Sequence, residues 1–134
     1  MITEDYVSFE IAKLLKEKGF DEKCHMCWDE VTKTMESADE YATNSELLAT
    51  YISAPTLQMA MKWLREKHNK IIIIGISLDD RTSSTIDHYI AGIWYVPKNN
   101  GGTFCYTSPT PYGGYPSFEE ACESAIKYCL EKLI

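Results

Sequence analysis

The sequence predicts a single α+β domain over 1–134, with helices covering both faces of a small, mainly antiparallel sheet of three to four strands. The first observation is a helical pattern over 55–69 that runs directly into the isoleucine-rich segment 70–77. Alternate isoleucines of that segment point to opposite faces, which is typical of a central strand covered on both sides. The second observation is that predicted helices and strands are mixed along the chain. Its length of 134 residues, 45% of them hydrophobic, suits one domain. A two-layer α+β packing is the alternative.

The first predicted helix begins after Ser8, whose side chain suits an N-cap, and continues to Lys18. Gly19 is placed to end it, and the apolar Phe20 follows. The next segment, 21–31, is aromatic and rich in thiols, and we interpret it as a strand. We expect 32–45 to be a connection, partly helical, and 46–52 is ambiguous between strand and helix.

The second predicted helix spans 55–69, because Pro55 suits a first helical position. Its apolar residues recur at helical spacing and form one stripe, which comprises Leu57, Ala60, Met61, Leu64 and His68. Met59 and Trp63 lie off this stripe. They are therefore either covered by a second layer or exposed as an anchor for a partner.

Beyond the isoleucine strand, 78–87 is predicted to be a polar loop and 88–96 a strand that pairs antiparallel with 70–77. Residues 97–102 have turn chemistry, and 103–106 returns as a short edge strand. A loop rich in Pro, Gly and Tyr follows over 107–116. The last helix opens with a capping box, in which Ser117 and Glu120 satisfy each other's backbone donors.

Three segments carry a family resemblance, and they are SFEIAKLLKEKGFDE (8–22), APTLQMAMKWLREKHN (54–69) and FEEACESAIKYCLEKLI (118–134). They resemble a family of short uncharacterised proteins encoded by intestinal bacteria and their phages or mobile elements. The resemblance covers the three helices and implies a small accessory protein, with no functional residues carried over. The order of elements is also similar, more weakly, to the αβα sandwich domains of phage proteins.

Charge and hydropathy limit the classes of function. A net charge of -7 disfavours nucleic acid as the main partner, because phosphate binding needs clustered Lys and Arg. The best basic candidates are Lys62, Arg65, Lys67 and Lys70. The longest apolar run is far too short to span a bilayer and the start is not a signal peptide, so we expect a soluble, cytoplasmic protein.

Two segments carry residues with metal or catalytic chemistry. Cys24 and Cys27 form a CxxC motif in the segment Cys24–Trp28, but residues three apart on a strand point to opposite faces, so we favour buried thiols over a metal or redox site. The loop from Asp79 to His88 gathers carboxylates and an imidazole, without the spacing of a known calcium motif. We predict no cofactor, no metal and no catalytic residues, and these two segments remain the alternative for a metal protein or small enzyme.

Partner binding agrees best with the remaining features. Exposed aromatic residues are enriched in interfaces, and tyrosines among Gly and Pro supply rigid contact area on a loop. We therefore predict a protein-binding module that is not an enzyme. Its candidate contact residues are Trp63, Met59, Tyr106, Tyr112 and Tyr115.

Overall fold

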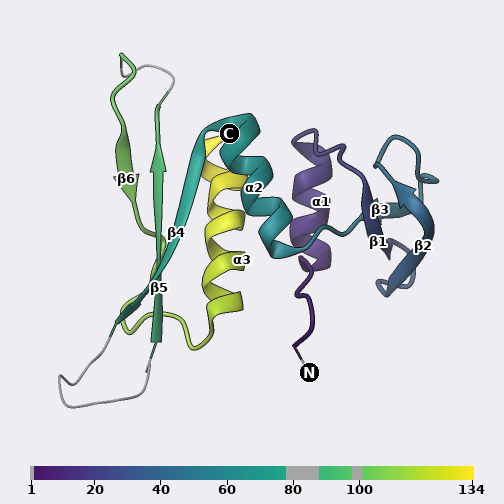
Figure 1. Ribbon diagram of the computed structural model, residues 1–134, viewed down its shortest axis with the longest axis horizontal. Helices are drawn as coiled ribbons and strands as arrows, with labels where there is room; N and C mark the ends of the chain where they lie inside the picture. The colour runs from purple at the N-terminus through teal and green to yellow at the C-terminus, as the bar shows by residue number, and fades with distance from the viewer. Residues whose placement is uncertain (1, 78–87, 98–100) are drawn as a thin grey trace. The chain divides into compact units, whose positions relative to one another are not determined.

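The computed structural model describes residues 2–77, 88–97 and 101–134 (Figure 1). It contains two compact units, Met1–Ala60 and Met61–Ile134, whose boundary falls inside the second helix. The α+β class with small antiparallel sheets is confirmed. The elements in order are α1 (Phe9–Glu17), β1 (Cys24–Asp29), β2 (Met35–Ala42), β3 (Tyr51–Ser53), α2 (Leu57–His68), β4 (Lys70–Ser77), β5 (His88–Tyr95), β6 (Cys105–Thr107), α3 (Phe118–Tyr128) and the π-helical turn η1 (Cys129–Leu133).

The described strands form two three-stranded sheets, β2-β1-β3 and β4-β5-β6, and not one sheet. In each sheet the middle strand pairs antiparallel with both neighbours. Each strand therefore pairs with strands that are close in sequence. The connections between paired strands are short, so closing them costs little entropy.

In the first unit, α1 begins after Ser8 as predicted and ends at Glu17, one residue before the predicted Lys18. The Ser8 side chain accepts a hydrogen bond from the Ile11 amide at 3.3 Å, and Gly19 has the positive φ of +92° that a helix C-terminus favours. Helix α1 packs against β3, and the indole N–H of Trp28 in β1 donates to the Val7 carbonyl at 3.0 Å. The predicted strand within 21–31 is confirmed.

The prediction of a connection over 32–45 is wrong, because Met35–Ala42 forms the edge strand β2. Its small and acidic side chains have low strand propensity, but its backbone pairs with β1 across Cys27 and Glu36. Exposed charges are a common feature of edge strands, where they discourage further pairing. The ambiguous segment 46–52 becomes turn structure that ends in the short strand β3.

Helix α2 starts later than predicted. Pro55 lies before it, and the Thr56 hydroxyl accepts a hydrogen bond from the Met59 amide at 3.1 Å, so Thr56 is the residue that caps the helix. The helix ends at His68, and the next residue, Asn69, adopts the left-handed conformation with φ +53°. Asparagine tolerates that conformation better than most residues.

The second unit contains the β4-β5-β6 sheet with α3 along one face, together with residues 61–68 of α2 and the turn η1 (Figure 1). The predicted antiparallel pairing of β4 with β5 is confirmed, as is the short strand at 105–107. The Ser117 N-cap is also confirmed, because its hydroxyl accepts from the Glu120 amide at 3.1 Å. The Glu120 carboxylate accepts from the Ser117 hydroxyl at 3.1 Å, whereas the capping box predicts a bond from the Ser117 backbone amide. The core of this unit comprises Leu64, Ala91, Ile93, Ala121, Cys122, Ala125, Ile126, Cys129 and Leu130, all buried.

The expectation that the isoleucine strand is covered on both faces is wrong. Ile73 in β4 is 52% exposed, and Ile90, which lies on the same face in β5, is 37% exposed. Helix α3 covers the face that carries Ile93 and Ala91. Among the described elements of this unit, none covers the other face to the same extent. This unit therefore has the two-layer arrangement that was the alternative.

Candidate functional site

The uncovered face of the β4-β5-β6 sheet carries a row of large apolar side chains. Antiparallel register places Ile71 opposite Trp94, and Trp94 opposite Tyr106, so the three side chains share one face. By the same alternation, Ile73 and Ile90 belong to this face. We call the five residues the apolar sheet face, and they are Ile71, Ile73, Ile90, Trp94 and Tyr106.

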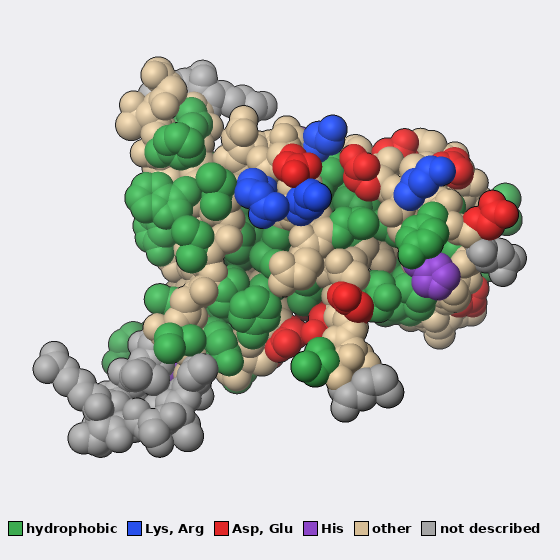
Figure 2. Space-filling model, in the orientation of Figure 1, with side chains coloured by type: hydrophobic (Ala, Val, Ile, Leu, Met, Phe, Trp, Pro, Cys, Tyr) green, Lys and Arg blue, Asp and Glu red, His purple; other side chains and the backbone are tan. Residues whose placement is uncertain are grey.

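Most of this face is accessible to solvent. The exposed fraction is 52% for Ile73, 41% for Trp94, 54% for Tyr106 and 37% for Ile90. Figure 2 shows hydrophobic side chains gathered over this part of the sheet, on the left of the view. Contiguous apolar patches on single chains commonly mark interaction sites.

The two aromatic rings of the face are held next to each other. The centroids of Trp94 and Tyr106 are 5.1 Å apart and the ring planes are tilted by 55°. Gly92 lies beneath the tyrosine, because a Cβ there would be 2.5 Å from the phenol oxygen and 2.7 Å from Cε2. The glycine therefore allows the Tyr106 ring to lie directly on the sheet backbone.

Hydrogen bonds fix the chain that follows β6 against β5. The Ser108 hydroxyl donates to the Ala91 carbonyl at 2.6 Å, and the Thr110 hydroxyl accepts from the Ala91 amide at 2.8 Å. These bonds are made at the free edge of β5, beyond the three residues of β6. A rigid support of this kind limits the entropy that a bound partner would have to remove.

The five residues of the apolar sheet face include no charged side chain, although the chain carries a net charge of -7. The phenol of Tyr106 is the one ionisable group among these five. The same alternation places the buried imidazole of His88 on this side of β5. The core of a protein interface is typically depleted in charged residues and enriched in aromatic ones. The composition of the face therefore agrees with protein binding.

The structure separates the five predicted contact residues. Tyr106 belongs to the apolar sheet face, and Tyr112 is fully exposed on the loop after β6. Trp63 is only 7% exposed, with its ring edge to face with His68 at 4.5 Å, and Tyr115 is buried with its hydroxyl donating to the Pro109 carbonyl at 3.0 Å. Trp63 and Tyr115 therefore have structural roles.

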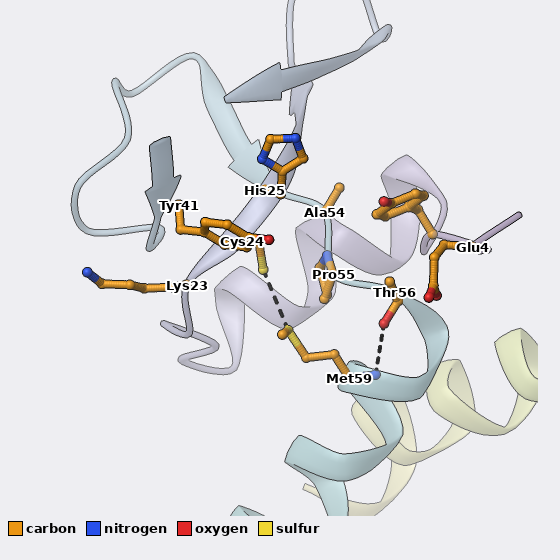
Figure 3. Close-up of a pocket in the computed structure, with 10 residues that line it drawn as sticks. Glu4, Lys23, Cys24, His25, Tyr41, Ala54, Pro55, Thr56 and Met59 are labelled. Atoms are coloured by element: carbon orange, nitrogen blue, oxygen red, sulfur yellow. Dashed lines mark hydrogen bonds between the residues drawn. The ribbon is translucent and has the colours of Figure 1, made fainter. Parts of the chain in front are cut away.

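Met59 lies in the first unit, in a small pocket of about 260 Å³ (Figure 3). The Cys24 thiol donates a weak hydrogen bond to its sulfur, with the two sulfur atoms 3.8 Å apart. Burial raises the pKa of the Cys24 thiol to about 11, so the group is a neutral thiol at physiological pH. Cys24 thus packs as a small apolar residue against Met59.

The CxxC motif does not form a joint site. Cys24 faces the pocket with Met59, whereas Cys27 lines a different pocket beside Glu36 and Tyr51. His25 points away from Cys24 in Figure 3 and its ring lies 5.3 Å from that of Tyr41. Within the described ranges, no group of three or more His, Cys, Asp or Glu residues could hold a metal ion.

Two further predictions concern the loop from Asp79 to His88 and the basic residues near α2. Residues 78–87 lie outside the described residues, and His88 at the end of the loop is buried in β5. Lys70, a proposed phosphate contact, is also buried, with its ammonium 5.8 Å from the centre of the Tyr95 ring. Lys62, Arg65 and Lys67 are exposed.

Sequence reasoning missed four residues of the apolar sheet face, namely Ile71, Ile73, Ile90 and Trp94. Their alternation was visible, since strands 70–77 and 88–95 are apolar on both faces. That pattern predicts burial on both faces only if a second layer exists. The sequence therefore showed that both faces of these strands are apolar. It did not show whether a helix covers each face.

The fold and the site define a class of small α+β protein in which one sheet face is apolar, rigid and uncovered. No protein-family model, curated protein or solved structure matches the chain. No helix among the described residues has both the length and the apolar character required to cross a membrane.

Proposed function

We propose that this chain is a protein-binding module without enzymatic activity, whose apolar sheet face docks an amphipathic helix of another protein. The observation that carries the proposal is the exposure of Ile73, Trp94 and Tyr106 side by side on a rigid sheet. The family resemblance adds the proposal that the protein acts as an accessory factor of a phage or mobile element.

The size of the face favours a narrow partner. An aromatic side chain buries ~200 Å², and with about half of each ring and the adjoining isoleucines uncovered the face presents roughly 400 Å². A standard protein interface buries about 800 Å² on each partner. The face is thus too small for a stable dimer of whole domains, but it suits the apolar stripe of one helix.

The architecture of the second unit supports a helix as the occupant. The opposite face of the same sheet is covered by α3, whose stripe of small and aliphatic residues packs against β4 and β5. A second helix on the apolar sheet face would complete a three-layer arrangement in which both faces of the isoleucine strand are buried. Because the chain is acidic, basic residues flanking the partner's apolar stripe would assist association.

The test places a photo-crosslinking amino acid at position 73 in the full chain, expressed in its source cells. Trp94→Glu in this background should abolish cross-linking, since a carboxylate would be desolvated in the contact. Tyr112→Glu is the matched control, because it makes the same change at an exposed aromatic residue outside the face. Far-ultraviolet circular dichroism confirms that both variants fold.

Each outcome decides the proposal. A cross-link to a segment of another protein, which as a synthetic peptide gains helicity on binding this chain, supports it. A cross-link to a second copy, together with a dimer in sedimentation velocity, shows that the occupant is not a partner helix. A cross-link within the same chain, or a yield no higher than with the crosslinker at position 112, shows that the face is not a docking site.

A further inference from the structure

A second feature of the second unit is the outer edge of its sheet at β4. Strand β4 is the last strand on one side of the sheet β4-β5-β6, so β5 pairs with only one of its two edges. It spans eight residues, whereas β6 at the opposite side of the sheet spans three. The free edge of β4 is therefore the longer of the two edges that this sheet presents.

Hydrogen bonds on the far side of β5 show how the backbone of that strand is oriented. The Tyr89 amide donates to the Tyr115 carbonyl at 2.8 Å, and the Tyr89 carbonyl accepts from the Tyr115 amide at the same distance. The Ala91 amide and carbonyl bond in the same direction, to the hydroxyls of Thr110 and Ser108. Tyr89 and Ala91 therefore direct their backbone groups away from β4.

The alternation of backbone groups along a strand then identifies the groups at the free edge of β4. Because successive residues direct their amides and carbonyls to opposite sides, Ile90 and Gly92 bond to β4. Their register partners are Gly75 and Ile73, so the odd-numbered residues of β4 bond to β5. The even-numbered residues direct their groups to the free edge, and these are Ile72, Ile74 and Ile76. Within the described ranges, the amides and carbonyls of these three residues have no hydrogen-bond partner.

The exposure of the side chains agrees with an open edge. Ile76 is 51% exposed, and Ile72 and Ile74 are only half-buried, although all three lie on the side of the sheet that α3 covers. On the same side of β5, Ile93 and Ala91 are fully buried. Burial therefore decreases from the middle strand to the edge, because no described element of this unit flanks β4 there.

The other edge strands of the chain carry features that prevent pairing, and β4 does not. Strand β2 has acidic side chains and an irregular register with β1, and β3 and β6 have only three residues each. Charge, irregularity and shortness all discourage the addition of another strand. Residues 71–76 of β4 include no proline and no charged side chain, and their register with β5 is unbroken. This edge is therefore a template on which a further strand can pair.

We propose that the free edge of β4 binds an extended segment of another protein, which adds to the sheet as a fourth strand. The outward groups span about 14 Å, two steps of ~6.8 Å along the strand, which matches a segment of about five residues. Both faces beside the edge are apolar, with Ile71 and Ile73 on one and Ile72 and Ile74 on the other. The segment therefore carries aliphatic side chains on both of its faces.

The net charge of the chain favours another protein over a second copy as the occupant. Each copy carries a charge of -7, so two copies joined through β4 would repel each other. Basic residues that flank the aliphatic segment would instead be attracted. The probe for this chemistry is a peptide of five valines between two lysines at each end, acetylated and amidated at its termini.

The test measures the hydrogen exchange of single backbone amides in the full chain by NMR, with and without this peptide. In the free chain the amides of Ile72, Ile74 and Ile76 should exchange at least roughly tenfold faster than those of Ile71 and Ile73, which are bonded to β5. Saturating peptide should slow the outward amides by at least roughly tenfold. The matched control is the same peptide with its five valines N-methylated, which has the side chains but lacks the N–H donors of a strand.

A variant of the chain tests the same edge from the other side. Ile74→Pro removes one outward N–H, and proline is tolerated in an edge strand where the N–H faces solvent. It should weaken peptide binding at least roughly tenfold, while Ile74→Ala, which keeps the N–H, should bind like the unaltered chain. Trp94→Glu should also keep peptide binding, because Trp94 lies in β5, so the edge is tested separately from helix docking.

The outcomes decide the proposal without relying on how well the proline variant folds. No slowing of the outward amides by the peptide, or equal slowing by the N-methylated peptide, overturns it. Outward amides that are already protected in the free chain, together with a dimer in sedimentation velocity, show a second copy at the edge and also overturn it. Slowing by the unmethylated peptide alone supports the addition of a partner strand.

Discussion

Gly92 provides a sharp test of how the apolar sheet face is built. An alanine at this position would place its Cβ 2.5 Å from the Tyr106 phenol oxygen, 2.7 Å from Cε2 and 2.9 Å from Cζ. Contacts this short are not sustained, so the ring must swing away from the sheet. Because Tyr106 is 54% exposed, its ring can move into solvent without disturbing the core.

The change in stability from Gly92→Ala should be small. Losing the contact between the Trp94 and Tyr106 rings costs about 0.5–1.5 kcal/mol. Replacing a glycine inside a strand with alanine raises the free energy of unfolding by about 0.5–1 kcal/mol, since alanine loses less backbone entropy on folding. The net change in the free energy of unfolding should therefore stay below about 1 kcal/mol in magnitude, measured by urea denaturation.

Partner binding should respond much more strongly. Displacing half a ring removes ~100 Å² of contact area, which is worth ~2.5 kcal/mol. The yield of partner cross-linked at position 73 should consequently fall at least roughly tenfold. Nuclear Overhauser contacts between the two rings should vanish at the same time.

Gly75→Ala is the matched control. Its Cβ would meet Ile90 Cγ1 at 3.3 Å and Cδ1 at 3.5 Å, distances that a small side-chain shift accommodates. It should leave the Trp94 and Tyr106 ring contacts and the cross-link intact. If Gly92→Ala keeps the ring contacts, or if both variants lose the cross-link equally, the reasoning about Tyr106 is refuted.

Three further predictions concern stability and reactivity. Ser117→Ala should lower the free energy of unfolding by about 1 kcal/mol, because it removes the cap of α3; an unchanged urea midpoint would contradict this. Burial raises the pKa of Cys129 to about 12, so at pH 8 a thiol reagent should modify Cys105 first and leave Cys129 intact until the protein is denatured. The pKa of Asp21 is lowered by its hydrogen bonds from Ser45, so its contribution to stability is present above its unfolded pKa and is lost as the pH falls through the lower folded value. NMR titration should show the Asp21 pKa rising toward its ordinary value in Ser45→Ala, and the opposite shift would contradict the assignment.

The sequence by itself determined where the three helices lie, because their signals are local. The caps at Ser8 and Ser117 and the Gly19 turn act within one turn of the chain and were predicted to the residue, whereas the start of α2 was not. The strands at 70–77 and 88–95 were equally plain, since β-branched and aromatic residues repeat without a break. Tyr106 was the one residue of the apolar sheet face that these patterns predicted as a contact residue.

Only the tertiary structure decided how the strands combine and which faces stay open. Strand β2 has weak local propensity and exists because β1 supplies its hydrogen-bond partners. The burial of Trp63 and the exposure of Trp94 likewise depend on which element lies over each side chain. The pocket lined by Cys27, Glu36 and Tyr51 likewise joins residues from three strands and a turn, whose proximity no local pattern encodes. Periodicity reveals that a face is apolar, whereas its burial is set by contacts between segments distant in the chain.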